Sequence, residues 1–231
     1  MSERTRELQR WFNSKGAHLV EDGAWGPMTR AAVIEVFRNR NAPAVTPDEV
    51  TLIANTLGAP ARNLRAVAKV ESAGGGWDND GLLKALWERH YLWRRVRIAV
   101  PFLSNPSPGG YTTDADNDGI NDSWEKLADA AGRFGLDVAA ECASFGKFQI
   151  MGAHWKALGY SSVREFVWQL SLSEFAHYDA FARFIRVNGL IGALRQIDGN
   201  PANCLAFARG FNGKGQKGYD GRIAAAWRTG G

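Results

Sequence analysis

Helical periodicity runs through most of this sequence, and segments in which apolar and polar residues alternate as along a β-strand are nearly absent. Leu64, Val67 and Ala68, for example, have the spacing that places them on one face of a helix. The one non-helical stretch of note within the larger part of the chain is residues 145–152. We therefore expect an all-α or α-rich fold with at most a small hairpin.

Helix-start signals recur in the second half of the chain. Ser171 precedes Glu174 by three residues, which is the spacing of a capping box. Asn200 stands directly before Pro201, and a proline fits the first helical position because the N–H that it lacks has no partner there in any helix. The sequence therefore predicts that helices begin after Ser171 and after Asn200.

The length and the prolines suggest two parts. A chain of 231 residues can hold one domain of ordinary size with a small one attached. Two prolines interrupt any helix in a short segment after residue 42, and Thr46 can open the next helix. We predict a small domain at residues 1–42, a linker at 43–47 and a large domain at 48–231.

The small domain carries the pattern Asp-Gly-Ala-Trp-Gly-Pro-Met-Thr at residues 22–29, with helices expected at residues 5–14 and 27–39. With the Leu-Gln pair that precedes it, this pattern resembles the three-helix peptidoglycan-binding domain of cell-wall hydrolases. The resemblance implies that Asp22 and Trp25 belong to a wall-binding site. The unit is shorter than usual for that family, and its third helix is either degenerate or replaced by the first helix of the large domain.

Glu71 continues the apolar stripe of Leu64, Val67 and Ala68, so its carboxyl group lies on the face that we expect to point into the domain. Glycines at 74–76 end the helix and leave Glu71 in the last turn, near the negative end of the helix dipole. Burial and the dipole both disfavour the ionised form and are expected to raise the pKa of Glu71. A carboxylic acid that stays protonated near neutral pH can protonate a glycosidic oxygen. The alternative is a structural glutamate that caps the helix or pairs with an arginine.

Several motifs lie along the chain in a fixed order. They are Val70-Glu71-Ser72, Trp87-Glu88-Arg89-His90, residues 143–152, Gly159-Tyr160, Phe211-Asn212-Gly213 and Tyr219. In that order they resemble the N-acetylmuramidase domain of phage endolysins, over residues 48–231. The resemblance implies a lysozyme-like domain that hydrolyses the β-1,4 bond between N-acetylmuramic acid and N-acetylglucosamine in peptidoglycan and so lyses the bacterial host.

The same resemblance implies roles for particular residues. Glu71 falls on the general acid of the family. The Gly-x-x-Gln-Ile and Asn-Gly segments of the wider lysozyme group line the sugar cleft, so the residues expected to bind substrate are Glu88, Ser144, Gln149, Asn212 and Tyr219. For Gln149 and Asn212 the structural alternative is a glycine-rich turn or a buried amide.

The second catalytic group is left open by the sequence. An inverting glycosidase needs a base about 6.5 to 9.5 Å from the acid, and a retaining one needs a nucleophile at about 5 to 5.5 Å. Asp78, Asp80 and Glu88 are candidates by their order in the chain, and Glu88 is preferred because Glu-Arg-His matches the family pattern. Glu88 can equally be a structural partner of Arg89 or of a backbone amide. Goose-type relatives act without a carboxylate nucleophile, so we assign no second residue.

Residues 114–125 match the twelve-position calcium-binding loop at every diagnostic position, including a glycine at the sixth that permits a sharp turn. The predicted ligands are Asp114, Asp116, Asp118, the carbonyl of Ile120, Asp122 and Glu125. So many neighbouring carboxylates repel one another unless a cation lies among them. Prolines before the loop exclude an entering helix, so we expect a lone structural calcium site rather than a paired sensor. The alternative is a solvated, aspartate-rich turn.

Charge and hydropathy narrow the class of partner. The 28 lysines and arginines exceed the 24 acidic residues, which gives a net charge of +4 and favours a polyanionic partner. Like charges do not gather in blocks, so nucleic acid is not expected. The start lacks a secretory signal and no apolar run approaches about 18 residues, so membrane insertion is not expected. With the resemblance, these features imply a monomeric endolysin that waits in the cytoplasm of the bacterial host until lysis releases it to the cell wall.

Other reaction classes fit the sequence less well. A zinc amidase would need clustered ligands, but no His-Glu-x-x-His occurs and the histidines are scattered at His18, His90, His154 and His177. No peptidase signature surrounds Cys142, and we expect it and Cys204 to be reduced structural thiols, although spacing does not decide whether they pair. Two alternatives stay open: a lytic transglycosylase that forms 1,6-anhydromuramic acid, and a non-catalytic wall-binding protein.

Overall fold

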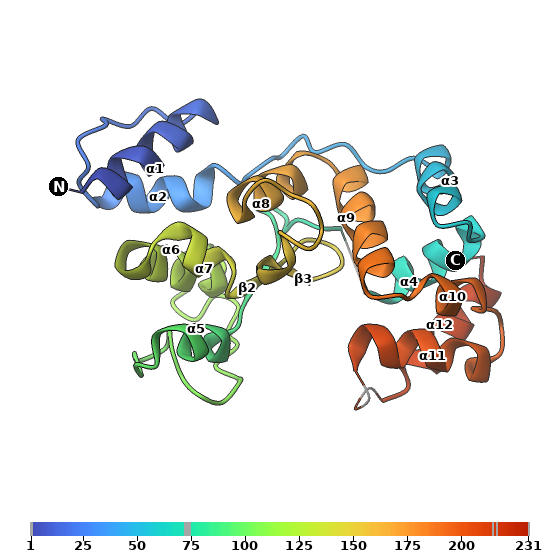
Figure 1. The fold of residues 1–231 in the computed structure, drawn as a ribbon. Coiled ribbons are helices and arrows are strands. Elements are labelled where there is room, and N and C mark those ends of the chain that lie inside the picture. Colours follow the sequence, from blue (N-terminus) through green and yellow to red (C-terminus); the bar gives the residue numbers. More distant parts are fainter. Residues whose placement is uncertain (1, 72–74, 214, 216, 231) are drawn as a thin grey trace. The chain divides into compact units, whose positions relative to one another are not determined.

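The computed structural model divides the chain into two compact units, each built from two separate stretches of sequence (Figure 1). The residues that it describes are 2–71, 75–213, 215 and 217–230. Unit 1 contains residues 1–41 and 77–171, and unit 2 contains residues 42–76 and 172–231.

Unit 1 combines helices with a small antiparallel sheet. Its helices are α1 (Glu3–Ser14), α2 (Pro27–Glu35), α5 (Arg89–Val96), α6 (Asp122–Phe134), α7 (Leu136–Ala140), the 3-10 helix η1 (Gly152–His154) and α8 (Val163–Leu172), whose last residue belongs to unit 2. Helix α6 packs against α2, α7 and the first strand of the sheet, so it forms the centre of the unit.

The sheet has three strands in the order β1 (Ala85–Trp87), β2 (Ala143–Phe145) and β3 (Ile150–Met151). Both pairs are antiparallel, with Leu86 opposite Ser144 and Phe145 opposite Ile150. The β2–β3 hairpin is the one expected near residues 145–152. Strand β1 was not predicted, because three residues are too few to show alternation.

Aromatic rings form the core of unit 1. Phe37 stacks on Trp124 with 5.2 Å between ring centroids, and Trp124 lies 5.8 Å from the ring of Phe145. The indole N–H of Trp124 donates to the carbonyl of Leu83 at 2.6 Å, so its polar atom is satisfied although the residue is buried. The core thus joins the N-terminal segment to α6 and the sheet.

Unit 2 consists of helices packed around a second aromatic core. Its helices are α3 (Pro47–Thr56), α4 (Ala61–Glu71), α9 (Glu174–Val187), α10 (Ile191–Arg195), α11 (Pro201–Asn212) and α12 (Tyr219–Arg228). The ring of Phe211 lies 5.3 Å from Phe181 and 6.4 Å from Tyr219, and stacks on Phe207 at 5.8 Å. Helix α4 packs against α3, α10 and α12.

A buried asparagine fixes α4 against two of its neighbours. Asn63 is only 2% exposed, and its amide donates to the carbonyl of Leu194 at 2.9 Å. Its own carbonyl accepts from the indole N–H of Trp227 at 2.9 Å. Because each polar atom has a partner, burial of this amide costs little and sets the register of α4 on α10 and α12.

Two of the three predicted helix starts are confirmed. Thr46 caps α3 in a capping box with Glu49, and Asn200 caps α11 by accepting from the N–H of Ala202. The prediction for Ser171 is wrong: it lies in the last turn of α8, where its hydroxyl donates to the carbonyl of Trp168. The next helix is capped by Ser173, whose extended backbone interrupts the helix and frees its side chain to accept from the N–H of Ala176.

The predicted helix 27–39 ends earlier than expected, at Glu35. Arg38 instead forms a bridge to Leu82, and the N–H of Asn39 donates to the carbonyl of Gly81. Tertiary pairing therefore overrides the helical pattern in this last turn. The prediction of an α-rich fold is confirmed, and no helix among the described residues is long and apolar enough to span a membrane.

Candidate active site

Glu71 is the last residue of α4, as its sequence position suggested. Leu64, Val67 and Ala68 on the same stripe are buried, and they place the glutamate at the inner face of unit 2. Ser72 and Gly74, which complete the predicted motif and the helix-ending glycines, lie outside the described residues.

Two predicted partners from the far end of the chain meet Glu71. The side chains of Tyr219, at the start of α12, and Asn212, at the end of α11, both lie against its carboxylate and favour its ionised form. Tyr219 is 2% exposed and belongs to the aromatic core. Core packing thus holds a hydroxyl donor in place against the acid.

Burial raises the pKa of Glu71 above its ordinary value of 4.5. The side chains of Tyr219 and Asn212 and the positive charge of Arg222 oppose this shift, but the loss of hydration is the larger effect. Burial, with the nearby charge of Glu71, also raises the pKa of Tyr219, so the phenol stays protonated and keeps its donor. The surroundings of Glu71 therefore favour the neutral form of its carboxyl group, with Tyr219 and Asn212 beside it.

Arg222 is a neighbour that the sequence analysis missed. It lies one helical turn after Tyr219 in α12, and its guanidinium is 5.5 Å from the centroid of the Tyr219 ring. It can stabilise the carboxylate once the proton has left. The three-residue spacing from Tyr219 was visible in the sequence, but nothing marked this arginine among the 28 basic residues.

Ser144 and Gln149 lie together in unit 1, in the β2–β3 hairpin. The Ser144 hydroxyl hydrogen-bonds to Gln149 Oε1 at 2.9 Å, and the Gln149 amide donates to the carbonyl of Gly146 at 2.8 Å. Gln149 has φ +46°, a left-handed conformation that is uncommon for glutamine. Its side chain thus closes the tight turn while remaining exposed.

Glu88 follows β1 and also belongs to unit 1. Its Oε2 accepts from the hydroxyl of Tyr111 at 2.8 Å and lies 3.1 Å from Nδ1 of His90. The backbone N–H of Glu88 donates to the carbonyl of Cys142, which ties it to the start of β2. The alternative reading, in which Glu88 pairs with Arg89, finds no such contact among the described residues, because Arg89 donates to two backbone carbonyls in the following loop.

Asp78 and Asp80 have structural contacts in the turn before β1. Asp78 Oδ1 accepts from the backbone N–H groups of Asp80 and Leu82 at 2.9 and 2.8 Å. Asp80 pairs with Arg38 at 3.5 Å. Of the three acidic candidates for a second group, Glu88 is the one whose carboxylate contacts a tyrosine hydroxyl and a histidine ring among the described residues.

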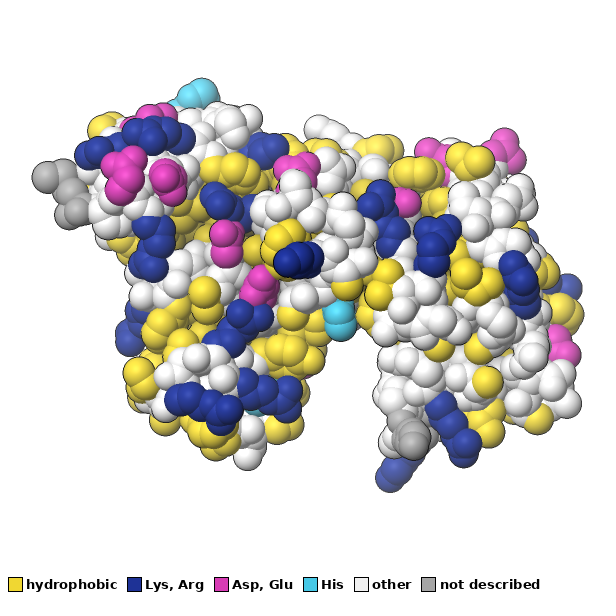
Figure 2. Space-filling view, in the orientation of Figure 1, with side chains coloured by type: hydrophobic (Ala, Val, Ile, Leu, Met, Phe, Trp, Pro, Cys, Tyr) yellow, Lys and Arg dark blue, Asp and Glu magenta, His cyan; other side chains and the backbone are white. Residues whose placement is uncertain are grey.

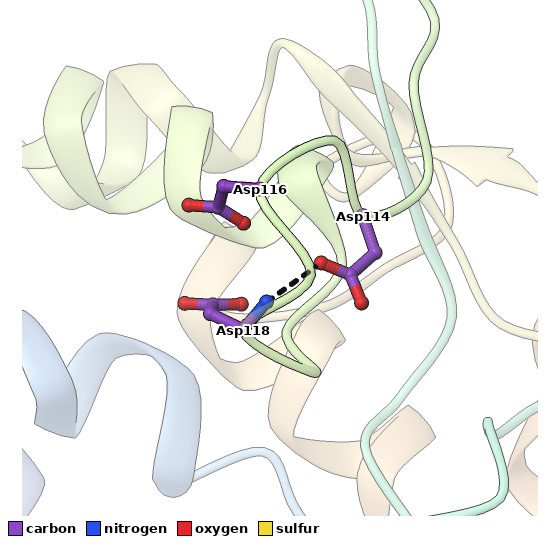
Figure 3. Close-up of side chains that lie close together, drawn as sticks. All are labelled: Asp114, Asp116 and Asp118. Atoms are coloured by element: carbon purple, nitrogen blue, oxygen red, sulfur yellow. Dashed lines mark hydrogen bonds between the residues drawn. The ribbon is translucent and has the colours of Figure 1, made fainter.

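The aspartate-rich loop brings its carboxylates together (Figure 3). Oxygens of Asp114, Asp116 and Asp118 lie within 4.8 Å of one another, and so do those of Asp116, Asp122 and Glu125. Gly119 at the sixth position has φ +84°, as the sharp turn requires. Asp114 also accepts from the backbone N–H of Asp118 at 3.0 Å (Figure 3). Oxygen donors in this arrangement suit a hard cation such as Ca²⁺.

Helix α6 starts within this loop, at Asp122. Burial raises the pKa of Glu125, and the negative charges of Asp118 and Asp116 add to the shift. Arg30 from α2 opposes it, since its guanidinium lies 3.4 Å from Glu125 and 2.9 Å from Asp129. The negative charge of Glu125, at the twelfth position of the loop, is therefore unfavourable unless a cation lies beside it.

The predicted wall-binding motif organises its own loop. The buried Gln9 donates to Asp22 Oδ1 at 2.9 Å and accepts from the N–H of Gly23 at 2.8 Å. Asp22 also accepts from the N–H of Ala24 at 2.8 Å. The Leu-Gln and Asp-Gly parts of the motif are therefore one hydrogen-bonded unit.

The two residues predicted to bind the wall, Trp25 and Asp22, have different surroundings. The indole packs on α6 so closely that a Cβ added to Gly132 would lie 2.5 Å from its Nε1. On the other side of the loop, a cavity of about 270 Å³ is lined by His18, Val20, Asp22 and Met28 among others. Asp22 faces this cavity, whereas Trp25 lines a different cavity of about 290 Å³ beside α6.

The two cysteines are free and buried, Cys142 in unit 1 and Cys204 in unit 2. Burial raises the pKa of the Cys142 thiol to about 12, so it stays protonated and unreactive near neutral pH. This agrees with the expectation of structural thiols.

The chain is similar to known proteins over nearly its whole length. Residues 60–230 match the sequence model of the N-acetylmuramidase family. The crystal structure of the Burkholderia AP3 phage endolysin aligns with a TM-score of 0.69 and 31% sequence identity, over 99% of this chain and 94% of that chain. A search of curated proteins gave no match. The family match contains Glu71, Asn212 and Tyr219 as well as the aspartate-rich loop.

Proposed function

The chain belongs to the N-acetylmuramidase family, as a glycoside hydrolase of the phage-endolysin type that acts on peptidoglycan, and we propose that Glu71 is its general acid. The bond cut is the β-1,4 linkage between N-acetylmuramic acid and N-acetylglucosamine. The observation that carries this proposal is the raised pKa of a partly buried glutamate held by Tyr219 and Asn212.

In the proposed reaction, Glu71 in its neutral form donates its proton to the glycosidic oxygen as the C–O bond breaks. Asn212 and Tyr219 hold the carboxyl group in one orientation, so little reorganisation is needed at the moment of transfer. Arg222 stabilises the carboxylate that remains. Water then attacks the sugar cation and loses a proton, and Glu71 takes up a proton again, which completes hydrolysis. Glu88, Ser144 and Gln149 of unit 1 are proposed to contact the sugar substrate.

The test is a comparison of Glu71→Gln with the matched variant Glu7→Gln, which removes an exposed carboxylate from α1. Glu71→Gln should lose roughly 100- to 10,000-fold in turnover, as expected for removal of a general acid, while still binding wall sacs. Glu7→Gln should keep its activity. Full turnover in Glu71→Gln would disprove the assignment.

Mass spectrometry of the products decides between hydrolysis and transglycosylation. Hydrolysis leaves a reducing muramic acid, whereas attack by the muramyl 6-hydroxyl leaves a 1,6-anhydro ring that is lighter by one water. We expect reducing ends from the wild-type chain. Anhydro ends as the main product would assign the chain to the transglycosylase chemistry with the same acid.

We also propose that residues 114–125 bind a structural Ca²⁺. Support comes from the twelve-position spacing, the two groups of converging carboxylate oxygens and the left-handed glycine at the sixth position. The ligands are the carboxylates of Asp114, Asp116, Asp118, Asp122 and Glu125 and the carbonyl of Ile120. The ion would offset the mutual repulsion of these groups and fix the start of α6.

Calcium at about 100 times its Kd should stabilise the chain by about 3 kcal/mol, or roughly 5–10 °C in melting temperature, and a chelator should reverse this. Asp116→Asn should abolish the shift, because Asp116 belongs to both carboxylate groups. Asp129→Asn is the control, since Asp129 is an exposed residue of α6 that lies outside both groups. An unchanged melting curve with calcium would refute the proposal.

Residues 1–42 are proposed to bind the wall through the cavity beside Asp22, and the family resemblance of that segment supports this role. The similarity to a phage endolysin supports a further proposal, that the chain waits as a monomer in the host cytoplasm until lysis. Cell fractionation with and without a co-expressed membrane pore tests the location, and gel filtration tests the monomer.

A further inference from the structure

A stretch of unit 1 is basic without interruption by acids. Between Glu88 and Asp114 the sequence has four arginines and no aspartate or glutamate. Arg94 and Arg97, in and just after α5, are both exposed. Each guanidinium lies near an aromatic ring, Arg94 at 5.3 Å from Tyr91 and Arg97 at 4.7 Å from Trp93. Within the described residues neither forms an ion pair.

The chain after α5 makes a tight turn that exposes a phenylalanine. The N–H of Leu103 donates to the carbonyl of Val100 at 3.1 Å, with Pro101 and Phe102 at the corner. Phe102 has φ +64°, the value at which this kind of turn normally takes glycine or asparagine. Its side chain is 83% exposed. A bulky side chain in a strained conformation therefore gains almost no packing within the unit.

The base of this turn is held firmly. Leu103 and Ser104 are buried, and the carbonyl of Leu103 accepts from the indole N–H of Trp87 at 2.9 Å. The Ser104 hydroxyl donates to the carbonyl of Ile98 at 2.7 Å. The turn is thus anchored to β1, and Phe102 projects from a rigid support rather than from a loose loop.

Apolar and basic side chains share this surface. Ile98 is 59% exposed, next to Arg97. Figure 2 shows lysine and arginine side chains together with hydrophobic ones over the part of unit 1 where α5 lies. Exposed apolar groups beside unpaired arginines match the chemistry of a membrane interface, where phosphates meet acyl chains.

We propose that Arg94, Arg97, Ile98 and Phe102 form a docking surface for an anionic lipid membrane. The arginines contact lipid phosphates, and Phe102 and Ile98 enter the boundary between headgroups and acyl chains. A soluble polyanion would use the arginines but would leave the phenylalanine without a partner. The exposed phenylalanine on a glycine-type turn position is what favours a lipid surface.

The experiment measures co-sedimentation of the full chain with vesicles. Binding is expected to vesicles of mixed phosphatidylcholine and phosphatidylglycerol and not to phosphatidylcholine alone, and added salt should weaken it. The double variant Arg94→Gln, Arg97→Gln should lower the partition constant by about thirtyfold. Phe102→Asn should lower it by about tenfold, and asparagine tolerates the left-handed backbone, so the turn should remain folded.

Matched controls replace side chains of the same kind elsewhere in the chain. Val187→Asn, at the end of α9, removes an apolar side chain that is 51% exposed, and the double variant Arg40→Gln, Arg133→Gln removes two exposed arginines of unit 1. Both should bind vesicles as the wild type does. All variants should keep their melting temperature and their turnover on soluble glycan fragments.

Three results would overturn the proposal. They are equal binding to neutral and anionic vesicles, unchanged binding of the Arg94, Arg97 variant, and loss of binding in that variant with Phe102→Asn unaffected. The last result would mean that the surface recognises negative charge in general rather than a lipid interface.

Discussion

The position of Glu71 could be predicted from the sequence, but its environment could not. Helical spacing placed the carboxyl group on the buried face of α4, and the structure agrees. Asn212 and Tyr219 were predicted to be site residues only because their motifs resemble those of the family. The contact itself depends on how α12 packs on α4, and Arg222 enters through that same packing without any sequence signal. Local pattern thus defines the acid, and tertiary packing defines its proton affinity.

The raised pKa of Glu71 predicts a pH-dependent difference in stability. Because the folded pKa lies above the unfolded value of 4.5, the stability linked to Glu71 is fully present below pH 4.5 and is lost as pH rises through the folded pKa. Glu71→Gln cannot ionise, so it should melt above the wild type at alkaline pH, and the gap should shrink in acid. Melting curves across pH measure this, with Glu7→Gln as the control. The turnover of the wild-type chain should also fall as pH rises through the raised pKa of Glu71, because only the neutral form can donate a proton.

Elements were predicted well where local signals decide them. The helix start at Thr46 and the cap at Asn200 form as expected, because the hydrogen bonds of these caps involve only neighbouring residues. The prediction for Ser171 failed because Ser173 caps a helix equally well and lies at the point where the backbone becomes extended. Helix α2 ends early because Arg38 pairs with Leu82, a partner that is distant in sequence. Errors thus arise where a local signal competes with tertiary structure.

The contact between α6 and Trp25 predicts an unusual effect of alanine. Gly132→Ala in a helix would normally stabilise by about 0.5–1 kcal/mol. The added Cβ would lie 2.5 Å from Trp25 Nε1, and overpacking of this kind costs about 1–3 kcal/mol. We therefore expect Gly132→Ala to lower the free energy of unfolding by about 1 kcal/mol.

Denaturant unfolding checks this prediction with two comparisons. Gly192→Ala in α10 is the control, since nothing lies within 4 Å of its added Cβ, and it should stabilise unit 2. In a Trp25→Ala background the cost of Gly132→Ala should disappear, as a double-mutant cycle would show. A stabilising Gly132→Ala in the native background would count against the packing described for Trp25.

At the scale of the whole molecule, sequence motifs divide the chain at residue 42, whereas contacts divide it into two units that each combine two separate stretches. Residues 1–41 share a core with residues 77–171, through Phe37 on Trp124 and the pairing of Arg30 with Asp129. The prolines after residue 42 indicated a boundary in the sequence, but nothing in the sequence indicated that the chain returns to unit 1 at residue 77. The wall-binding role of residues 1–42 stays a prediction, yet that segment is part of unit 1.

This arrangement predicts what removal of the segment will do. Deletion of residues 1–42 uncovers Trp124, which is 1% exposed, so the truncated chain should melt several degrees lower or aggregate. Wall binding is therefore better tested with Met28→Ser, which changes the cavity beside Asp22 without opening the core. That variant should pellet less with wall sacs and keep its turnover on soluble fragments. Unchanged pelleting would argue against this cavity as the wall-binding site.

The interleaving of the two units has a consequence for the order of events on the ribosome. Residues 42–76 emerge early but complete their unit only when residues 172–231 follow, and at about 5–20 residues per second that delay is many seconds. Tyr219 and Arg222 are made only after more than 140 residues have followed Glu71. A nascent chain or a truncated product that ends before them thus carries Glu71 exposed to water and without these neighbours, and the proton donor is assembled only after residue 222 has been made.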